Sequence, residues 1–214
     1  MARGRLITIE GLDGAGKTTL AAELVAALAA HGPEVRMLRE PGGVAAAERV
    51  RDLVKDPTLA IAPRAEALLY AAARAQLVEE LVEPLLFDGT WVVLDRFLDS
   101  SLAYQGAGRG LGIEAVRAIN RFALGGLMPD RTLLLRVDPL TGRARQRERD
   151  EVPDRLERED DAFFATIAAA YDALAAAEPQ RVVTIDADDP PDTVRAAAIA
   201  AIEDLVEAYE ADRA

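Results

Sequence analysis

Residues 11–18 read GLDGAGKT, from Gly11 to Thr18, and this stretch fits the pattern G-x-x-x-x-G-K-[ST]. The apolar run Arg5–Glu10 precedes it and the Ala/Leu-rich run Thr18–Ala30 follows it, so it lies between a predicted strand and a predicted helix. Glycines here let the backbone curl until successive N–H groups point at phosphate oxygens, and the helix adds its positive dipole end. The stretch therefore predicts a phosphate-binding loop at the start of an α/β fold.

All residues of this loop are candidate ATP-binding residues: Gly11, Leu12, Asp13, Gly14, Ala15, Gly16, Lys17 and Thr18. Lys17 has the position of the lysine that reaches the β- and γ-phosphates, and Thr18 has that of the hydroxyl that holds Mg²⁺. A fortuitous glycine-rich turn is the alternative, and the flanking strand and helix argue against it. The motif indicates nucleotide binding but not the acceptor, because hydrolytic switches, transport ATPases and small-molecule kinases share it.

Outward from the loop, short apolar segments alternate with longer segments of helical spacing. The predicted strands are Arg5–Glu10, Val35–Arg39, Trp91–Asp95, Arg131–Val137 and Arg181–Ile185. The predicted helices are Thr18–Ala30, Ala45–Val54, Pro63–Phe87, Glu114–Leu124, Asp160–Ala177 and Asp192–Tyr209. This alternation predicts right-handed βαβ units and a parallel sheet with helices on both faces. We expect a single domain over residues 1–214, in which the arginine-rich stretch Arg143–Arg158 is a mobile insertion.

The composition narrows the class of protein. Half of the 214 residues are apolar, which is enough for one core, and the absence of cysteine excludes disulfides, thiolate metal sites and cysteine nucleophiles. A net charge of −12 argues against a nucleic-acid-binding surface. No segment approaches the roughly 20 apolar residues of a membrane helix, and the N-terminal run is too short for a signal peptide. We therefore expect a cytoplasmic protein with no membrane or nucleic-acid partner.

Further motifs follow the loop in a characteristic order. They are Arg39-Glu40-Pro41-Gly42-Gly43, Leu69-Tyr70-Ala71-Ala72-Ala73-Arg74, Asp95-Arg96-Phe97, Ser100-Ser101-Leu102-Ala103-Tyr104-Gln105-Gly106 and Ile185-Asp186-Ala187. In their order and spacing the chain resembles the bacterial thymidylate kinases over essentially its whole length. The resemblance implies the P-loop nucleoside monophosphate kinase fold, a five-stranded parallel sheet flanked by helices, with a lid at about residues 142–158. It also implies a homodimer, for which the apolar helical stretch 65–87 could provide a face.

Two of these motifs have a chemical reading of their own. Tyr70 and Arg74 lie four residues apart and share one helix face, where the ring can stack on a pyrimidine and the guanidinium can donate to a base carbonyl. Asp95 ends an apolar strand, where a carboxylate would face a metal ion and its waters. Arg96 would then point into the cleft at the carboxyl edge of the sheet. Tyr70 could instead be an ordinary core aromatic, and Asp95 with Arg96 could be a local salt bridge.

The resemblance also assigns roles around a bound dTMP. Asp13 would hold the 3′-hydroxyl of the deoxyribose, and Arg96 would bind the acceptor phosphate and the transferring phosphoryl group. Ser101 and Gln105 would contact the thymine, and Tyr104 would sense the 2′ position of the sugar. Arg39 and Glu40 would line the same region, with Arg51 near the pyrimidine and the phosphate. The full set of predicted dTMP-binding residues is Asp13, Arg39, Glu40, Arg51, Tyr70, Arg74, Arg96, Ser101, Tyr104 and Gln105.

The variable positions of the phosphate-binding loop, residues 12–15, carry no basic side chain. Phosphoryl transfer needs positive charge over the equatorial oxygens, so an arginine from another segment is expected. The resemblance implies that the lid supplies it, with Arg149 as the first candidate and Arg147 as the second, beside Lys17 and Arg96 as catalytic residues. Arg155 would orient the lid. A solvated charged helix is the alternative, because acidic residues are interleaved here, and spacing does not choose among Arg143, Arg145, Arg147, Arg149 and Arg155.

The predicted reaction is in-line transfer of the γ-phosphoryl group of ATP to dTMP, giving dTDP for dTTP biosynthesis, with Mg²⁺ as cofactor. The acceptor phosphate is ionised at neutral pH, so positioning and charge neutralisation carry the rate without a strong general base. A kinase for another pyrimidine nucleoside monophosphate is one alternative. A P-loop NTPase that is not a kinase is the other, and the Tyr70/Arg74 pair with Arg96 argues against it.

Overall fold

The strands of the protein form one parallel sheet in the order β2-β3-β1-β4-β5. The computed structural model describes residues 3–148 and 153–213. Its strands are β1 (Leu6–Gly11), β2 (Val35–Arg39), β3 (Trp91–Asp95), β4 (Arg131–Arg136) and β5 (Val182–Asp186). The predicted five-stranded parallel sheet is confirmed, with strand ends displaced by one residue at most. β1 lies between β3 and β4, so its carboxyl end, where the phosphate-binding loop begins, is at the middle of the sheet edge.

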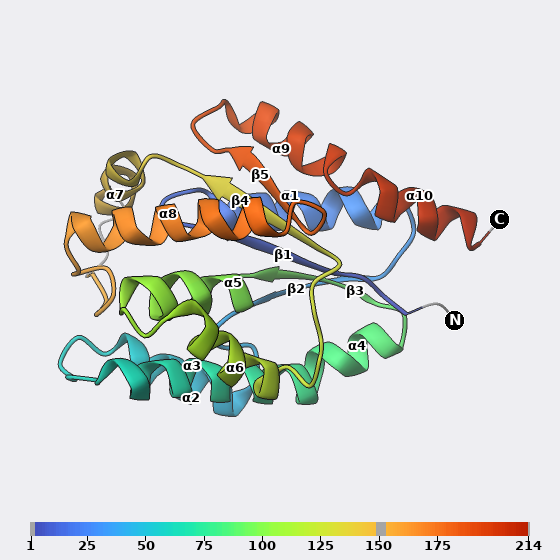
Figure 1. The fold of residues 1–214 in the computed structure, drawn as a ribbon. Coiled ribbons are helices and arrows are strands. Elements are labelled where there is room, and N and C mark those ends of the chain that lie inside the picture. Colours follow the sequence, from blue (N-terminus) through green and yellow to red (C-terminus); the bar gives the residue numbers. More distant parts are fainter. Residues whose placement is uncertain (1–2, 149–152, 214) are drawn as a thin grey trace.

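Helices cover both faces of the sheet (Figure 1). They are α1 (Lys17–Ala29), α2 (Ala45–Lys55), α3 (Pro63–Leu77), η1 (Val78–Val82), α4 (Glu83–Phe87), α5 (Leu98–Ser101), η2 (Leu102–Gly108), α6 (Ile113–Ala123), α7 (Pro139–Arg147), α8 (Asp161–Ala177), α9 (Pro191–Ala200) and α10 (Glu203–Ala211). In Figure 1, α9 and α10 lie above the sheet and α2, α3 and α6 below it. Both chain ends lie at the opposite end of the molecule from α7.

The sheet separates two apolar cores. Ile7 and Ile9 of β1 belong to one core, together with Leu24 of α1. Leu6 of the same strand belongs to the other, together with Leu77 of α3. Side chains alternate between the faces of a strand, so both sets of positions must be apolar when both faces are covered. This explains why the strands read as continuous apolar runs in the sequence.

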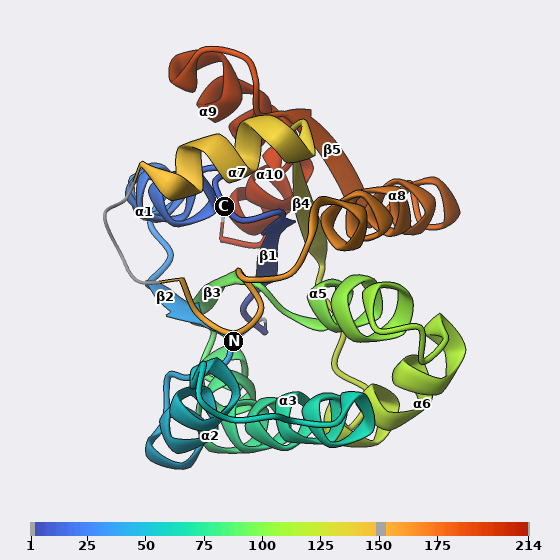
Figure 2. The ribbon, with the colours of Figure 1, turned by 90° about the vertical axis from the view of Figure 1, so that its left-hand side faces the viewer.

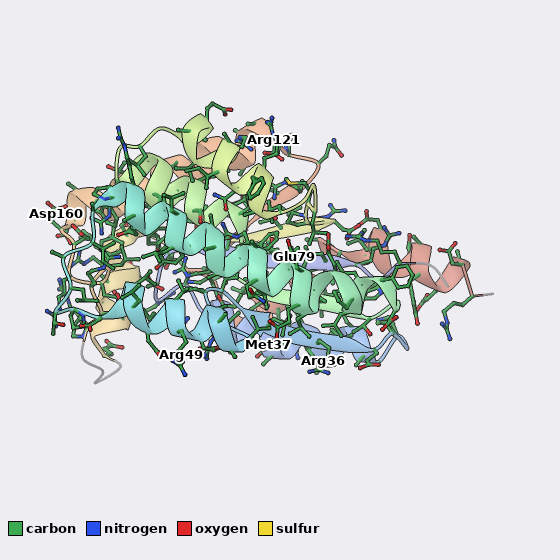
Figure 3. The ribbon with its side chains drawn as sticks, turned by 90° about the horizontal axis from the view of Figure 1, so that it is seen from below. Arg36, Met37, Arg49, Glu79, Arg121 and Asp160 are labelled. Carbon is green, nitrogen blue, oxygen red and sulfur yellow. The ribbon has the colours of Figure 1, made fainter. Side chains whose placement is uncertain are left out.

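The predicted helix Pro63–Phe87 is confirmed as a continuous helical segment with a wider, π-helical turn inside it. α3 passes through η1 into α4 without a break, and Figure 3 shows the three as one rod between α2 and α6. Pro84 lies at the start of α4 and has no N–H to donate to the preceding turn. A π-helical turn directly before it lets the chain continue around the proline ring.

Three segments differ from the sequence-based prediction. Residues 98–108, for which the sequence analysis predicted no element, form α5 and η2; residues 98–106 are buried on all sides, which leaves no polar face to reveal a helix. The arginine-rich insertion begins as a helix, α7, because Asp138 accepts hydrogen bonds from the N–H groups of Leu140 and Thr141 at 3.0 and 3.1 Å. The predicted helix Asp192–Tyr209 is interrupted between α9 and α10, where Ile202 turns into the core.

Trp91, the single tryptophan, lies at the first position of β3 and is buried. Its ring meets that of Tyr209 in α10 edge to face, with centroids 5.7 Å apart. The C-terminal helix is therefore docked on the end of the sheet that lies away from the phosphate-binding loop. Among the helices described in residues 3–148 and 153–213, we find none with the length and apolarity that a membrane span requires.

Candidate active site

A cavity of about 580 Å³ opens at the carboxyl ends of β1, β2 and β3. The phosphate-binding loop forms one part of its lining. Other parts come from β2 and the turn after it, the end of β3, α2, α3, α5, η2, and Asp154, Leu156 and Glu157. Figure 2 shows the molecule from this end, with the segment 153–160 (orange) passing in front of the strands. The structure places all ten predicted dTMP-binding residues, from Asp13 to Gln105, in the lining of this cavity. In the predicted ATP-binding loop, Gly11 and Leu12 border a smaller neighbouring cavity beside β4 instead.

The backbone of the phosphate-binding loop adopts the left-handed region at Gly14 (φ 82°) and Gly16 (φ 90°). Glycine takes this conformation without a Cβ penalty, which is why the sequence has glycine there. A Cβ on Gly14 would lie 2.2 Å from the carbonyl oxygen of Gly142, so α7 packs directly on the loop. Lys17 begins α1 and is 7% exposed, and its ammonium donates to the carbonyl oxygen of Leu12 at 2.8 Å.

Asp13 shares its carboxylate between two cations. Its Oδ1 accepts from Nη2 of Arg96 at 2.6 Å and lies 3.8 Å from Nζ of Lys17. Burial raises the pKa of Asp13, but the charges of Arg96 and Lys17 outweigh it and hold that pKa well below its usual range. Burial and the nearby charge of Arg96 lower the pKa of Lys17 to about 8, although Asp13 opposes this. Lys17 and Arg96 therefore bring two positive charges to the phosphate end of the cavity, with Asp13 as their shared counter-charge.

Thr18 and Asp95 meet at the wall of the same cavity. The Thr18 hydroxyl donates to Oδ2 of Asp95 at 2.7 Å, which brings the predicted metal-binding pair together. The described residues hold no group of three or more His, Cys, Asp or Glu side chains that could bind a metal by themselves. A hydroxyl and one carboxylate suit Mg²⁺, which keeps several waters and takes its other ligands from substrate phosphates.

Arg96 links the phosphate-binding loop to the rest of the cavity. It is the one non-glycine residue with a positive φ, 69°, in the described part of the chain. Its Nη1 donates to the carbonyl oxygen of Gly11 at 3.2 Å and to Oγ of Ser100 at 3.0 Å, and its guanidinium lies 5.0 Å from the ring centre of Tyr104. Burial lowers the pKa of Arg96, but the surrounding Asp13, Tyr104, Tyr171 and Asp95 together outweigh burial and raise that pKa well above the usual value. The predicted orientation into the cleft is confirmed by these contacts.

Glu10 is a buried acid that the sequence analysis did not single out. It ends the apolar run of β1 with 0% exposure. Its carboxylate accepts from the N–H of Phe97 at 2.8 Å, the N–H of Ser100 at 3.2 Å, the Ser100 hydroxyl at 2.6 Å and the Tyr171 hydroxyl at 3.0 Å. Burial raises the pKa of Glu10. Glu10 thereby holds the turn that carries Arg96. In the sequence, a single charged residue among the uncharged residues of β1 was the signal that could have identified Glu10.

Arg74 lies at the back of the cavity, with 1% exposure. Its Nε and Nη2 donate to Glu40 at 2.8 and 2.6 Å, and its Nη2 also donates to the carbonyl oxygen of Phe97 at 2.8 Å. Its Nη1 donates to Ser101 at 2.9 Å and to Asn120. Every N–H direction of the guanidinium therefore has a protein partner. Burial raises the pKa of Glu40 to about 7, although Arg74 opposes this. Direct donation from Arg74 to a base stays a prediction.

Arg39, Arg51 and Tyr70 also line the cavity. Arg51 donates through Nη1 to the carbonyl oxygen of Pro41 at 2.9 Å, and Arg39 pairs with Glu48 at 3.2 Å. Burial raises the pKa of the Tyr70 hydroxyl, so this side chain is a neutral aromatic wall. Tyr70 is thus a cavity residue rather than an ordinary core aromatic.

The lid arginines are placed differently from one another. Arg143 donates to the carbonyl oxygen of Glu159 at 2.8 Å, and Arg145 donates to that of Ala187 at 3.0 Å. Arg147 ends α7, and within residues 3–148 and 153–213 it forms no ion pair and does not line the cavity. Arg149 lies outside the described residues. Arg155 reaches Glu66 at 2.6 Å, below the cavity wall.

Here a phosphate-binding loop shares one cavity with a second site that contains Arg74 and Arg96. This is the arrangement of a P-loop kinase for a small acceptor, the nucleoside monophosphate kinase class. The thymidylate kinase family profile matches residues 9–198. The chain belongs to the thymidylate kinase family.

Individual relatives agree with this assignment. The thymidylate kinase of Deinococcus radiodurans is 48% identical over 95% of this chain and 98% of its own. That of Halorhodospira halophila is 44% identical over 95% and 96%. The crystal structure of thymidylate kinase from Ehrlichia chaffeensis superposes with a TM-score of 0.76 at 27% identity, covering 94% of this chain and 99% of the other.

Proposed function

We propose that this chain transfers the γ-phosphoryl group of ATP to dTMP and forms dTDP, as an ATP-dependent transferase of nucleotide biosynthesis. Family membership supports the reaction. The observation that carries it in the structure is Arg96, whose guanidinium contacts both the loop, at Gly11, and the acceptor side of the cavity, at Ser100. A P-loop NTPase that acts without an acceptor does not need an arginine that contacts both sides of the cavity, as Arg96 does, so that alternative is not favoured.

The phosphate end of the cavity supplies charge and orientation. Lys17 and the loop N–H groups bind the ATP phosphates, and Lys17 gives up its contact with Leu12 to do so. Thr18 and Asp95 would hold Mg²⁺, which neutralises phosphate charge when bound. Arg96 leaves Asp13 for the acceptor phosphate and the transferring group, and the freed Asp13 carboxylate accepts from the 3′-hydroxyl. Asp13 thus holds the Arg96 guanidinium in position near the expected acceptor phosphate.

The acceptor end of the cavity holds the nucleoside. The ring of Tyr70 stacks on the pyrimidine, and Ser101 and Gln105 lie where they can contact its polar edge. Arg74 holds the side chains of Ser101 and Glu40 by hydrogen bonds, and we propose that it also donates to a carbonyl of the base. Arg39, Glu40 and Arg51 line the wall on the side of β2 and α2, and Tyr104 lies beside Arg96 near the expected sugar.

The chain is one catalytic domain with its lid at about residues 142–158, in this proposal. The contact of Gly14 with Gly142 supports a position of α7 over the phosphate-binding loop. Arg149 is the first candidate for the lid arginine that assists transfer and Arg147 the second, whereas Arg143, Arg145 and Arg155 contact Glu159, Ala187 and Glu66.

The quaternary structure is proposed to be a homodimer. Leu53 of α2, Leu68 of α3 and Phe122 of α6 are exposed apolar side chains, 41%, 56% and 94% accessible. α2, α3 and α6 lie on the face that Figure 3 shows, which also carries the charged Arg49 of α2 and Glu79 of η1. Sedimentation at micromolar concentration tests this: a mass of one chain would contradict it. We also propose that the enzyme works in the cytoplasm, where ATP and dTMP are available.

A coupled ADP-release assay with ATP and Mg²⁺ tests the function. It compares dTMP with dUMP, UMP, CMP and no acceptor. We expect rapid release with dTMP and little with the other acceptors. A clear preference for another pyrimidine monophosphate would overturn the substrate assignment, and release that does not depend on an acceptor would mean an NTPase.

A further inference from the structure

Glu66, in the first turn of α3, is a fully buried carboxylate that the proposed reaction does not use. Its Oε1 accepts from Nε2 of Gln105 at 2.9 Å and from Nε of Arg109 at 3.2 Å. Its Oε2 lies 2.6 Å from Nη1 of Arg155. Gln105 belongs to η2 and Arg109 follows it directly, whereas Arg155 belongs to the segment 153–159. One acid therefore joins three separate parts of the chain behind the acceptor cavity.

The contact with Glu66 determines which way the Gln105 amide faces. An ionised carboxylate only accepts hydrogen bonds, so Gln105 must direct its NH₂ group to Glu66. Its carbonyl oxygen is then the end that remains for a ligand, and Gln105 lines the cavity while being 2% exposed. A carbonyl oxygen accepts from the N3–H group of a thymine or uracil ring. It finds no such donor at N3 of cytosine, so this orientation favours the former two bases.

The contact with Arg155 holds one wall of the same cavity. Leu156 and Glu157, next to Arg155, line the cavity. Nε of Arg155 also donates to the carbonyl oxygen of Val54 at 3.0 Å, but Glu66 is its charged partner. The Arg155 side chain is 12% exposed and Glu66 is 0% exposed, so water screens this ion pair little.

The charges around Glu66 balance. Arg109 contacts Glu66 and also Glu159, at 2.5 Å, so two arginines and two glutamates form one network. Loss of the Glu66 charge would leave Arg109 and Arg155 with one acid between them. A buried cation without its partner is costly, and Arg155 would leave, because Arg109 keeps Glu159 whereas Arg155 loses its charged partner Glu66.

We propose that Glu66 is a positioning residue of the acceptor site. It sets the orientation of the Gln105 amide, which selects pyrimidines with an N3–H group, and through Arg155 it holds the segment 153–157 against the acceptor. Glu66 does not touch the substrate. The inference rests on the proposed dTMP kinase function.

The test separates the two roles with two variants and a control. Glu66→Gln removes the charge and lets the Gln105 amide reverse, so we expect the KM for dTMP to rise by about tenfold, the equivalent of ~1.4 kcal/mol of lost binding. We expect the preference for dTMP over CMP to fall by a similar factor, with the KM for ATP unchanged. Arg155→Gln should raise the KM for dTMP but keep the preference, because Gln105 remains held. Arg158→Gln is the matched control, since Arg158 is exposed and its Nε donates only to the carbonyl oxygen of Pro153.

The outcomes are distinct. An unchanged KM for dTMP and an unchanged preference in Glu66→Gln would overturn the proposal, as would an equal rise in the KM for ATP. If Glu66→Gln does not fold, Arg155→Gln still tests the wall, and a KM equal to that of Arg158→Gln overturns it.

A measurement without turnover keeps the inference distinct from the proposed function. Absence of dTMP turnover in the wild type would contradict the proposed function but not the positioning role of Glu66. The positioning role predicts that dTMP protects the bond after Arg155 from trypsin in the wild type and not in Glu66→Gln, as read by mass spectrometry. Equal protection, or none in either protein, contradicts it.

Discussion

Replacing Glu10 with glutamine keeps the shape of the side chain but removes the charge that holds the turn of Arg96. The carboxylate accepts four hydrogen bonds, from the N–H groups of Phe97 and Ser100 and the hydroxyls of Ser100 and Tyr171. A glutamine oxygen can keep the two backbone donors. Its NH₂ group would then face the two hydroxyls, and these must turn round to accept from it.

The magnitude follows from these contacts. Hydrogen bonds to a charged group contribute about 1.5–3 kcal/mol each and neutral ones about 0.5–1.5, so loss of the charge weakens each bond by roughly 1 kcal/mol. Relief of the buried charge offsets part of this, and we expect a net loss of about 1–3 kcal/mol in the free energy of unfolding. The hydroxyl of Ser100 also accepts from Nη1 of Arg96 at 3.0 Å, so its rotation misplaces the guanidinium. A misplaced catalytic group costs about 100-fold in rate, which sets the expected fall in kcat/KM for dTMP.

Steady-state kinetics and urea unfolding of Glu10→Gln measure both quantities. The control is Asp99→Asn, another buried carboxylate, whose partners Arg181 and Thr132 do not line the cavity. It should lose stability and keep its kcat/KM for dTMP. A kcat/KM of Glu10→Gln within about threefold of wild type would refute the reasoning, as would an equal kinetic loss in Asp99→Asn.

Three further predictions concern the phosphate end of the site. Because the pKa of Lys17 is about 8, Lys17 loses its charge as the pH rises through that value. We expect kcat/KM for ATP to fall by up to about tenfold per pH unit above it. Lys17→Arg should abolish this pH dependence, and an unchanged pH dependence in that variant would exclude Lys17 as its source. Gly14→Ala forces a φ of 82° and a contact with Gly142, so we expect a lower Tm and a loss of about tenfold or more in kcat/KM for ATP; wild-type values would contradict the tight packing of α7 on the loop. Thr18→Val removes the hydroxyl beside Asp95 and should raise the Mg²⁺ concentration for half-maximal rate by about 10–100-fold, whereas an unchanged Mg²⁺ titration would exclude this pair from metal binding.

Sequence patterns were sufficient for the parts of the site that are local. The loop from Gly11 to Thr18 needs its glycines for backbone reasons that one segment contains, and Asp95 and Arg96 could be placed because parallel strands bring their carboxyl ends to one edge. Helical spacing put Tyr70 on one face with Arg74, and the resemblance to thymidylate kinases assigned that face to the pyrimidine. In each case the neighbours that matter are within a few residues or follow from the fold class.

The parts that could not be predicted depend on contacts between distant segments. In the sequence, Glu10 and Glu66 look like an ordinary strand residue and an ordinary helix residue. Glu10 has a partner 161 residues away, Tyr171, and Glu66 has one 89 residues away, Arg155. Helices α5 and η2 are enclosed by the core, so their polarity gives no period to read. Arg74 was recognised as a site residue, but its saturation by Glu40, Ser101, Asn120 and Phe97 is a property of the packed molecule.

The contact of Trp91 with Tyr209 has a practical consequence for spectroscopy. The single indole of the chain lies in the core beneath α10, at the end of β3 that faces away from the ligands. We therefore expect its fluorescence to report whether the C-terminal helix is docked on the sheet, with little response to ATP or dTMP, because Trp91 does not line the cavity. The protein thus has an intrinsic optical probe of its global unfolding that can be followed in the presence of either substrate without correction for occupancy.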